Sequence, residues 1–146
     1  MLNQSAEYAL RATLYMAAQG SRKAYKATAL AEALGVPPNY LSKILHALVR
    51  TKVLTSERGP TGGYRLAVAP SRLPLERAIS PFQELKHRGP CLLGDRACNH
   101  NDPCAAHQRW GQMTDVFMSF IRNTTLADML VALPPAETTG SMTEVA

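Results

Sequence analysis

Residues 35–50 read GVPPNYLSKILHALVR, a stretch that combines a helix-ending turn with the start of an amphipathic helix. Gly35 can take the positive φ that ends a helix, and a proline suits the first position of the next one. We therefore expect helices over Thr28–Leu34 and Pro38–Thr51. Two helices joined by a short turn that contains glycine predict a helix-turn-helix, whose second helix is sized for the major groove of DNA.

The periodicity of these two helices separates their inner and outer faces. The first should turn Leu30, Ala33 and Leu34 inward. The second should bury Leu41, Ile44, Leu45 and Leu48, and present Asn39, Tyr40, Ser42, Lys43 and His46 on its polar face. An earlier helix is expected over Gln4–Gln19, with Ala6, Leu10, Leu14 and Ala17 at helical spacing.

A hairpin is predicted directly after the helix-turn-helix. Val53–Ser56 and Tyr64–Ala67 read as strands, and residues 58–63 between them read RGPTGG, a Gly/Pro-rich tip. A basic-tipped hairpin in this position is typical of the wing of a winged helix. The predicted fold class is therefore mainly α with a small β-hairpin, a winged helix-turn-helix followed by a long helix.

The second half of the chain should contain that long helix, over Ala105–Arg122. Pro70–Pro74 reads as a linker, Leu75–Leu85 as a short helix interrupted at Pro81, and Lys86–Asp102 as an irregular loop. The long helix carries an apolar stripe of Trp110, Met113, Phe117, Phe120 and Ile121, widened by Val116 and Met118. We interpret it as a dimerisation helix, with an ordinary core helix as the alternative.

The sequence divides into three parts. Residues 1–73 are predicted to be the DNA-binding domain, residues 74–133 the linker helix, cysteine loop and dimerisation helix, and residues 134–146 a disordered tail. Thr125 and Asp128 have capping-box spacing for a last short helix, which Pro134-Pro135 should end.

Charge supports this division. Residues 1–73 hold ten Lys or Arg and three acids, formally +7, whereas residues 74–146 hold six and eight, formally −2. A basic half joined to a mildly acidic half is typical of a nucleic-acid-binding module attached to a different module. The apolar stretch Ala9–Ala18 is interrupted by Arg11 and is too short to cross a bilayer, and no secretion leader is visible, so we expect a cytoplasmic protein.

Candidate DNA contacts lie on the second helix of the motif and on the hairpin tip. Arg58 should meet the backbone or the minor groove, because glycines beside it let the main chain approach closely. The other candidates at the tip are Gly59 and Thr61. Asn39, Tyr40, Ser42 and Lys43 are the groove-facing candidates, and Arg50, Lys52 and Lys26 are expected at phosphates.

Three cysteines, Cys91, Cys98 and Cys104, are followed by His107 in the pattern C-x6-C-x5-C-x2-H. An odd number of thiols on one short segment does not suggest a disulfide framework. The spacing favours an iron–sulfur cluster and a Cys3His zinc site equally, with three idle thiols as the third interpretation. His100 is interpreted as an exposed loop residue. A Cys104–His107 thiolate pair could serve an enzyme, but no substrate pocket is recognisable, so no enzyme is expected.

These features resemble the iron–sulfur winged-helix transcription regulators of the IscR/NsrR family. The resemblance extends to about Leu133 and is carried by EYALR at residues 7–11, VPPNYLSKI at 36–44, RGPTGGYRL at 58–66, the three cysteines and NTTLAD at 123–128. One departure is the first cysteine gap, which has six residues here and five in the family members considered.

The resemblance implies a homodimer that binds a pseudo-palindromic DNA operator, expected to act as a repressor. It implies an iron–sulfur cluster, 2Fe–2S in the first place with 4Fe–4S as the alternative, sensing nitric oxide, redox or iron and cluster status. Cys91, Cys98, Cys104 and His107 would be its ligands, and Glu7 of the partner subunit is the alternative to His107. It also supports Arg58, Asn39, Tyr40 and Lys43 as DNA contacts. The alternative function is a winged-helix regulator with a structural zinc Cys3His site or no metal.

Overall fold

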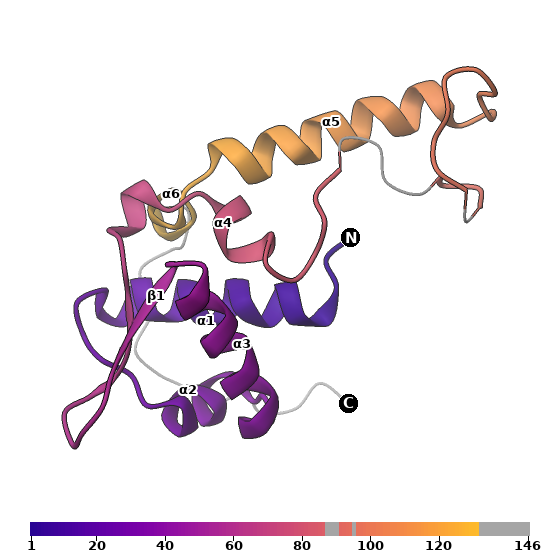
Figure 1. The fold of residues 1–146 in the computed structure, drawn as a ribbon. Coiled ribbons are helices and arrows are strands. Elements are labelled where there is room, and N and C mark those ends of the chain that lie inside the picture. The colour runs from indigo at the N-terminus through magenta and orange to yellow at the C-terminus, as the bar shows by residue number, and fades with distance from the viewer. Residues whose placement is uncertain (87–90, 95, 132–146) are drawn as a thin grey trace, which may run out of the picture.

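The computed structural model describes residues 1–86, 91–94 and 96–131 of the chain. Its first part is three helices and a hairpin, α1 (Gln4–Gly20), α2 (Ala27–Leu34), α3 (Pro38–Arg50), β1 (Leu54–Glu57) and β2 (Gly63–Leu66). A 3-10 turn η1 (Pro70–Arg72) leads to α4 (Leu75–Ile79), α5 (His107–Asn123) and α6 (Leu126–Val131). Figure 1 shows α5 extending away from the other helices, with the segment that precedes it at its far end. Within the described residues, no helix combines the length and apolarity needed to cross a membrane.

The helix-turn-helix is confirmed. Gly35 adopts the left-handed conformation (φ 64°) and its N–H bonds back to the carbonyls of Ala31 and Glu32, so α2 ends there. Pro38 occupies the first turn of α3, where its missing N–H costs nothing. The four apolar residues expected inside α3, Leu41, Ile44, Leu45 and Leu48, are all buried.

The hairpin is confirmed as well, and it has a third participant. β1 and β2 pair antiparallel, with Leu54 opposite Leu66 and Glu57 opposite Gly63. Tyr25, in the connection between α1 and α2, forms an isolated antiparallel bridge with Tyr64. The wing is therefore attached along β2 to the segment that enters α2.

The core is centred on the alanine face of α1. Ala6, Ala9, Ala12 and Met16 are fully buried, and α1 packs against α3, α4 and α6. The buried face of α1 differs from the expected one, because Leu10, Leu14 and Ala17 are only partly buried at the edge of this core. Small side chains let helix backbones approach closely, which explains why alanines occupy the centre. In α2, Ala33 is exposed rather than inward, and Ala31 is buried instead.

The second half departs from expectation at two helix ends. α4 ends at Ile79 instead of extending to Leu85; Ser80 is still helical as its C-cap, and Pro81 after it has no backbone N–H to continue the helix. α5 begins at His107, after Ala106 as its N-cap. The backbone of Leu73–Leu75 then bonds to Thr124 and Leu126, with Leu75 N to Thr124 O at 2.9 Å and Leu126 N to Leu73 O at 3.0 Å. Pro134-Pro135 and the tail 136–146 lie outside the described residues.

Candidate DNA interface and cysteine loop

Helix α3 presents most of its predicted contact residues outward. Asn39, Lys43 and His46 are exposed and Ser42 is partly exposed. Tyr40 is placed differently, because its hydroxyl lies 2.5 Å from Ser5 Oγ and its ring packs edge-on against Tyr8. Tyr40 therefore ties α3 to α1, a role that its place on the polar face did not indicate.

The wing tip is exposed and held in a closed turn. Arg58, Gly59 and Thr61, the predicted contacts at this tip, are all exposed. The N–H of Gly62 donates to Gly59 O at 3.1 Å, and Gly59 takes a positive φ of 105°. A Cβ on Gly62 would lie 2.2 Å from the carbonyl oxygen of Glu57, so this turn requires glycine there.

Helix α3, the recognition helix of the helix-turn-helix, lies next to the wing. The ring centroids of His46 in α3 and Tyr64 in β2 are 6.0 Å apart. Arg65 braces the base of the hairpin, because Nη2 bonds Glu57 at 3.2 Å and Nη1 bonds the carbonyl of Arg22. Lys26, which was expected at a phosphate, donates from Nζ to Gly59 O at 2.7 Å in this DNA-free structure.

The C-terminal end of α3 carries two further predicted contacts. Arg50 is exposed in its last turn, and with Lys43 it lines a groove of about 340 Å³ beside Ser5, Tyr40 and Phe82. Lys52 takes a left-handed conformation (φ 60°) just after the helix, and Arg77 donates to its carbonyl at 3.2 Å. A side chain of α4 thus holds the backbone that follows Arg50.

The four predicted cluster ligands all lie on one segment, where they form two pairs. Cys91 Sγ and Cys104 Sγ are 3.3 Å apart, and Cys98 Sγ is 3.3 Å from His107 Nδ1. The other ring nitrogen of His107 is 3.3 Å from His100 Nδ1, so His100 contacts the candidate ligand set. In the part of the chain that the structure describes, no three His, Cys, Asp or Glu side chains are gathered into one metal site.

The surroundings of Cys91 lower the pKa of its thiol on balance, against the opposing effect of burial. A hydrogen bond from the backbone of Leu93 lowers the pKa of its thiol, the thiol of Cys104 lowers it further, and the charge of Arg96 adds to this. Arg96 is itself paired with Asp102 at 2.5 Å. Three soft thiols and an imidazole are a donor set that suits iron–sulfur clusters and zinc alike.

Glu7, the alternative fourth ligand, is not near these cysteines within one chain. It sits on α1, 3.7 Å from Arg11, whereas Figure 1 shows the cysteine loop at the far end of α5.

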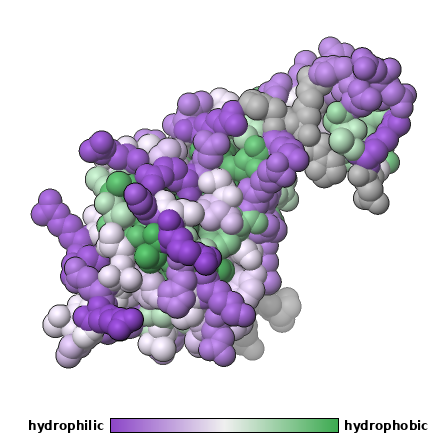
Figure 2. All heavy atoms as spheres, in the orientation of Figure 1, coloured by the Kyte–Doolittle hydropathy of each residue, from purple (hydrophilic) through white to green (hydrophobic). Residues whose placement is uncertain are grey.

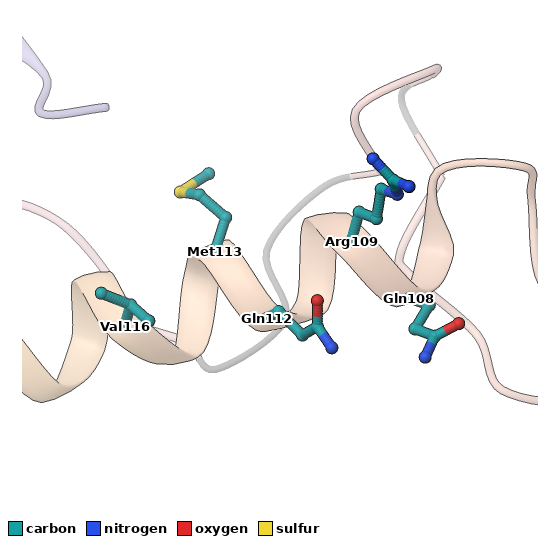
Figure 3. A pocket seen from close by; sticks show the side chains of 5 residues that line it. All are labelled: Gln108, Arg109, Gln112, Met113 and Val116. Carbon is teal, nitrogen blue, oxygen red and sulfur yellow. The ribbon is translucent and has the colours of Figure 1, made fainter.

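The outward face of α5 exposes apolar side chains among polar ones. Val116 is 71% exposed and Phe120 46%, whereas Met118 and Ile121 of the same predicted stripe are buried. Gln108, Arg109, Gln112, Met113 and Val116 line a groove of about 700 Å³ along the helix, and Figure 3 shows their side chains spread over its first turns. Figure 2 shows that hydrophilic side chains cover much of the extended end of the molecule on the face in view.

Comparison with known proteins gives a consistent result along the chain. Residues 2–132 match the model of the Rrf2 family, described as "Iron-dependent Transcriptional regulator". A protein of Aquifex aeolicus named as an HTH-type transcriptional regulator is 28% identical over 132 residues, which is 89% of this chain and 91% of that protein. BadM of Rhodopseudomonas palustris is 31% identical over 88% of this chain and 80% of its own length. The HTH-type transcriptional regulator IscR of Escherichia coli is 27% identical over 88% and 79%.

Solved structures have the same fold. CymR (YrzC), described as the global cysteine regulator of B. subtilis, superposes with a TM-score of 0.76 at 18% identity, covering 92% of this chain and 98% of that one. The IscR of T. potens gives a TM-score of 0.73 at 20% identity, covering 97% and 93%. These likenesses confirm the predicted winged-helix fold.

Proposed function

The chain belongs to the Rrf2 family of DNA-binding transcriptional regulators, which are not enzymes. From this premise we propose that it is a dimeric repressor controlled by an iron–sulfur cluster. It would act in the cytoplasm on a pseudo-palindromic operator. The observation that carries the proposal is the pairing of Cys91 with Cys104, and of Cys98 with His107, on the segment that leads into α5.

DNA would be bound by α3 and the wing together. Lys43, Asn39 and Ser42 are available for the major groove, and Arg58 and Thr61 for the backbone or minor groove beside it. Arg50, in the last turn of α3, would hold a phosphate. The short separation of His46 and Tyr64 supports a single surface formed by helix and wing.

The pairing of the ligands favours a 2Fe–2S cluster over 4Fe–4S. Each iron of a two-iron cluster needs two protein ligands, and the loop offers Cys91 with Cys104 and Cys98 with His107. When bound, such a cluster would supply a centre that reacts with nitric oxide or oxidants. His107 would use Nδ1, the nitrogen that faces Cys98, and Glu7 of the partner subunit remains the alternative to it.

The link from this loop to DNA would run through α5. His107 is the first residue of that helix, and Val116 and Phe120 on its exposed face would pack against the second subunit. Releasing Cys104 and His107 from a common centre would free the first turn of α5. That would change the relative placement of the two winged helices, and two half-sites bind well only when their spacing matches the DNA.

The test is anaerobic purification followed by visible absorbance, iron and sulfide analysis, and a DNA-shift assay with and without nitric oxide. We expect a coloured protein whose DNA affinity changes when the colour is bleached. Cys98→Ala should be colourless and folded, and Asn101→Ala, an exposed neighbour in the loop, should keep the colour. A colourless wild-type protein with one zinc per chain would instead support the structural zinc site. A protein without metal would support a winged-helix regulator that binds no metal.

A further inference from the structure

The connection between α1 and α2 is fixed against the wing. The N–H of Tyr25 donates to Tyr64 O at 2.8 Å, and the N–H of Tyr64 donates back to Tyr25 O at 2.8 Å. Gly63 makes this approach possible, because a Cβ on it would lie 2.5 Å from Tyr25 O. Lys26 follows Tyr25 directly and is the N-cap residue of α2, so its backbone is held from both sides.

The side chain of Lys26 reaches the wing tip from this fixed base. Its ammonium group donates to the carbonyl of Gly59 at 2.7 Å, across 33 residues of sequence. The same carbonyl accepts the Gly62 N–H that closes the turn at the tip. Lys26 therefore binds the carbonyl that closes the turn, next to Arg58 and in the same turn as Thr61.

We infer that Lys26 is a positioning residue, which fixes the wing tip so that Arg58 meets DNA, rather than a phosphate contact of its own. β1 ends at Glu57 and β2 begins at Gly63, so residues 58–62 extend beyond the strand ladder. A two-stranded hairpin is only marginally stable by itself, so a tether at its tip has a large effect on where the tip lies. The inference rests on the proposed DNA-binding role of the wing.

A double-mutant cycle separates positioning from direct contact. The affinities of wild type, Lys26→Met, Arg58→Ala and the double variant are measured on a duplex selected from a random-sequence pool with the wild-type protein. We expect Lys26→Met to weaken binding about fivefold in wild type and to have little further effect in Arg58→Ala. If Lys26 and Arg58 each contacted a phosphate independently, the factors by which their substitutions weaken DNA binding would multiply in the double variant. Each substitution would also lower the slope of log affinity against log salt by about one, and this result would overturn the inference.

Lys23→Met is the matched control, because it removes the same charge from the same connection. Lys23 Nζ lies over the Tyr25 ring, 6.0 Å from its centroid, and not at the wing tip. Any factor by which Lys23→Met weakens DNA binding should multiply with that of Arg58→Ala in the double variant.

A second measurement needs no DNA. Amide hydrogen exchange in residues 58–62 should quicken in Lys26→Met and stay unchanged in Lys23→Met. Unchanged exchange in Lys26→Met would overturn the inference. If the wild-type protein selects no duplex from the pool, the proposed function fails, whereas the exchange experiment still tests the tether.

Discussion

The backbone N–H of Asn3 donates to Oε1 of Gln83 at 2.7 Å, which joins the start of α1 to a segment 80 residues later. The contact is reinforced on both sides, because Asn3 Nδ2 donates to Phe82 O and Gln83 Nε2 donates to Met1 O, each at 2.8 Å. Asn3 also caps α1 by accepting the N–H of Ala6 at 2.8 Å. Residues 82 and 83, which follow α4, are thus attached to the first turn of α1, where Ser5 bonds Tyr40 of α3.

Asn3→Ala should destabilise the protein by about 1–2 kcal/mol, because it removes both the helix cap and the bond to Phe82. Urea unfolding followed by circular dichroism measures the loss. Asn39→Ala, an exposed amide on α3, is the control and should change the free energy of unfolding by less than about 0.5 kcal/mol. Equal effects of the two substitutions would mean that the Asn3 contacts contribute nothing.

Gly63→Ala should detach the wing from Tyr25. Gly63 takes a positive φ of 142°, and the new methyl group would meet the Tyr25 backbone, so a loss of about 1–3 kcal/mol in stability is expected together with weaker DNA binding. Thermal unfolding and a DNA titration measure the two effects. Gly94→Ala, where no atom lies within 4 Å of the added Cβ, should leave both unchanged. Wild-type DNA affinity in Gly63→Ala would contradict a role for the Tyr25–Tyr64 bridge.

Arg58→Ala should weaken DNA binding and lower the slope of log affinity against log salt by about one phosphate contact. The reason is that Arg58 is exposed at the tip of the wing, where its guanidinium can reach the backbone or a narrow minor groove. Fluorescence anisotropy titrations over a series of salt concentrations measure the slope. An unchanged slope with unchanged affinity would remove Arg58 from the interface.

The local features of this fold could be predicted from the sequence, whereas its long-range contacts could not. Gly35 with Pro38 marks the turn, the spacing of Leu41 to Leu48 marks the buried face of α3, and the Gly-rich tip marks the wing. The Tyr25–Tyr64 bridge is a single residue pair with no periodic pattern to mark it. The alanine face of α1 was predicted only at Ala6, because larger apolar residues at the same spacing gave an equally good helical stripe.

The candidate site was predictable in its residue types but not in its arrangement. Thiols followed by a histidine indicate a soft-metal donor set whatever the path of the loop. The pairing of Cys91 with Cys104, and the contact of His100 with His107, depend on that path, which spacing does not determine. Similarly, the position of Tyr40 on a polar helix face did not indicate its bond to Ser5.

Val116→Glu should convert a dimer into monomers. Val116 lies on the exposed face of α5 in the groove with Met113 and Arg109, and a buried, unpaired carboxylate at a subunit interface is costly. Sedimentation velocity at several protein concentrations measures the oligomeric state. Ala18→Glu places the same charge on an exposed residue of α1 and should leave the dimer intact. A dimeric Val116→Glu variant would place the interface elsewhere.

Asp128 should contribute a pH-dependent part of the stability of α6. Thr125 and Asp128 form the predicted capping box: the backbone N–H and the hydroxyl of Thr125 each donate to Asp128 Oδ2 at 2.8 Å, and the Asp128 N–H donates to Thr125 Oγ1 at 3.2 Å. The backbone hydrogen bond, and then that of the hydroxyl, lower the pKa of the Asp128 carboxyl below its ordinary value. A lowered carboxyl pKa adds stability that is complete above the unfolded-state pKa, about 4, and is lost as the pH falls through the folded-state value.

We therefore expect Asp128→Asn to melt below wild type at neutral pH, with the difference in Tm shrinking as the pH falls from about 4 towards 2. Differential scanning fluorimetry over that range measures the difference. Thr125→Val keeps the backbone N–H that has the larger effect on this pKa, so it should retain part of the pH dependence that Asp128→Asn removes. A difference between wild type and Asp128→Asn that stays constant into acid would mean that the charge of Asp128, as opposed to its shape, does not stabilise the helix.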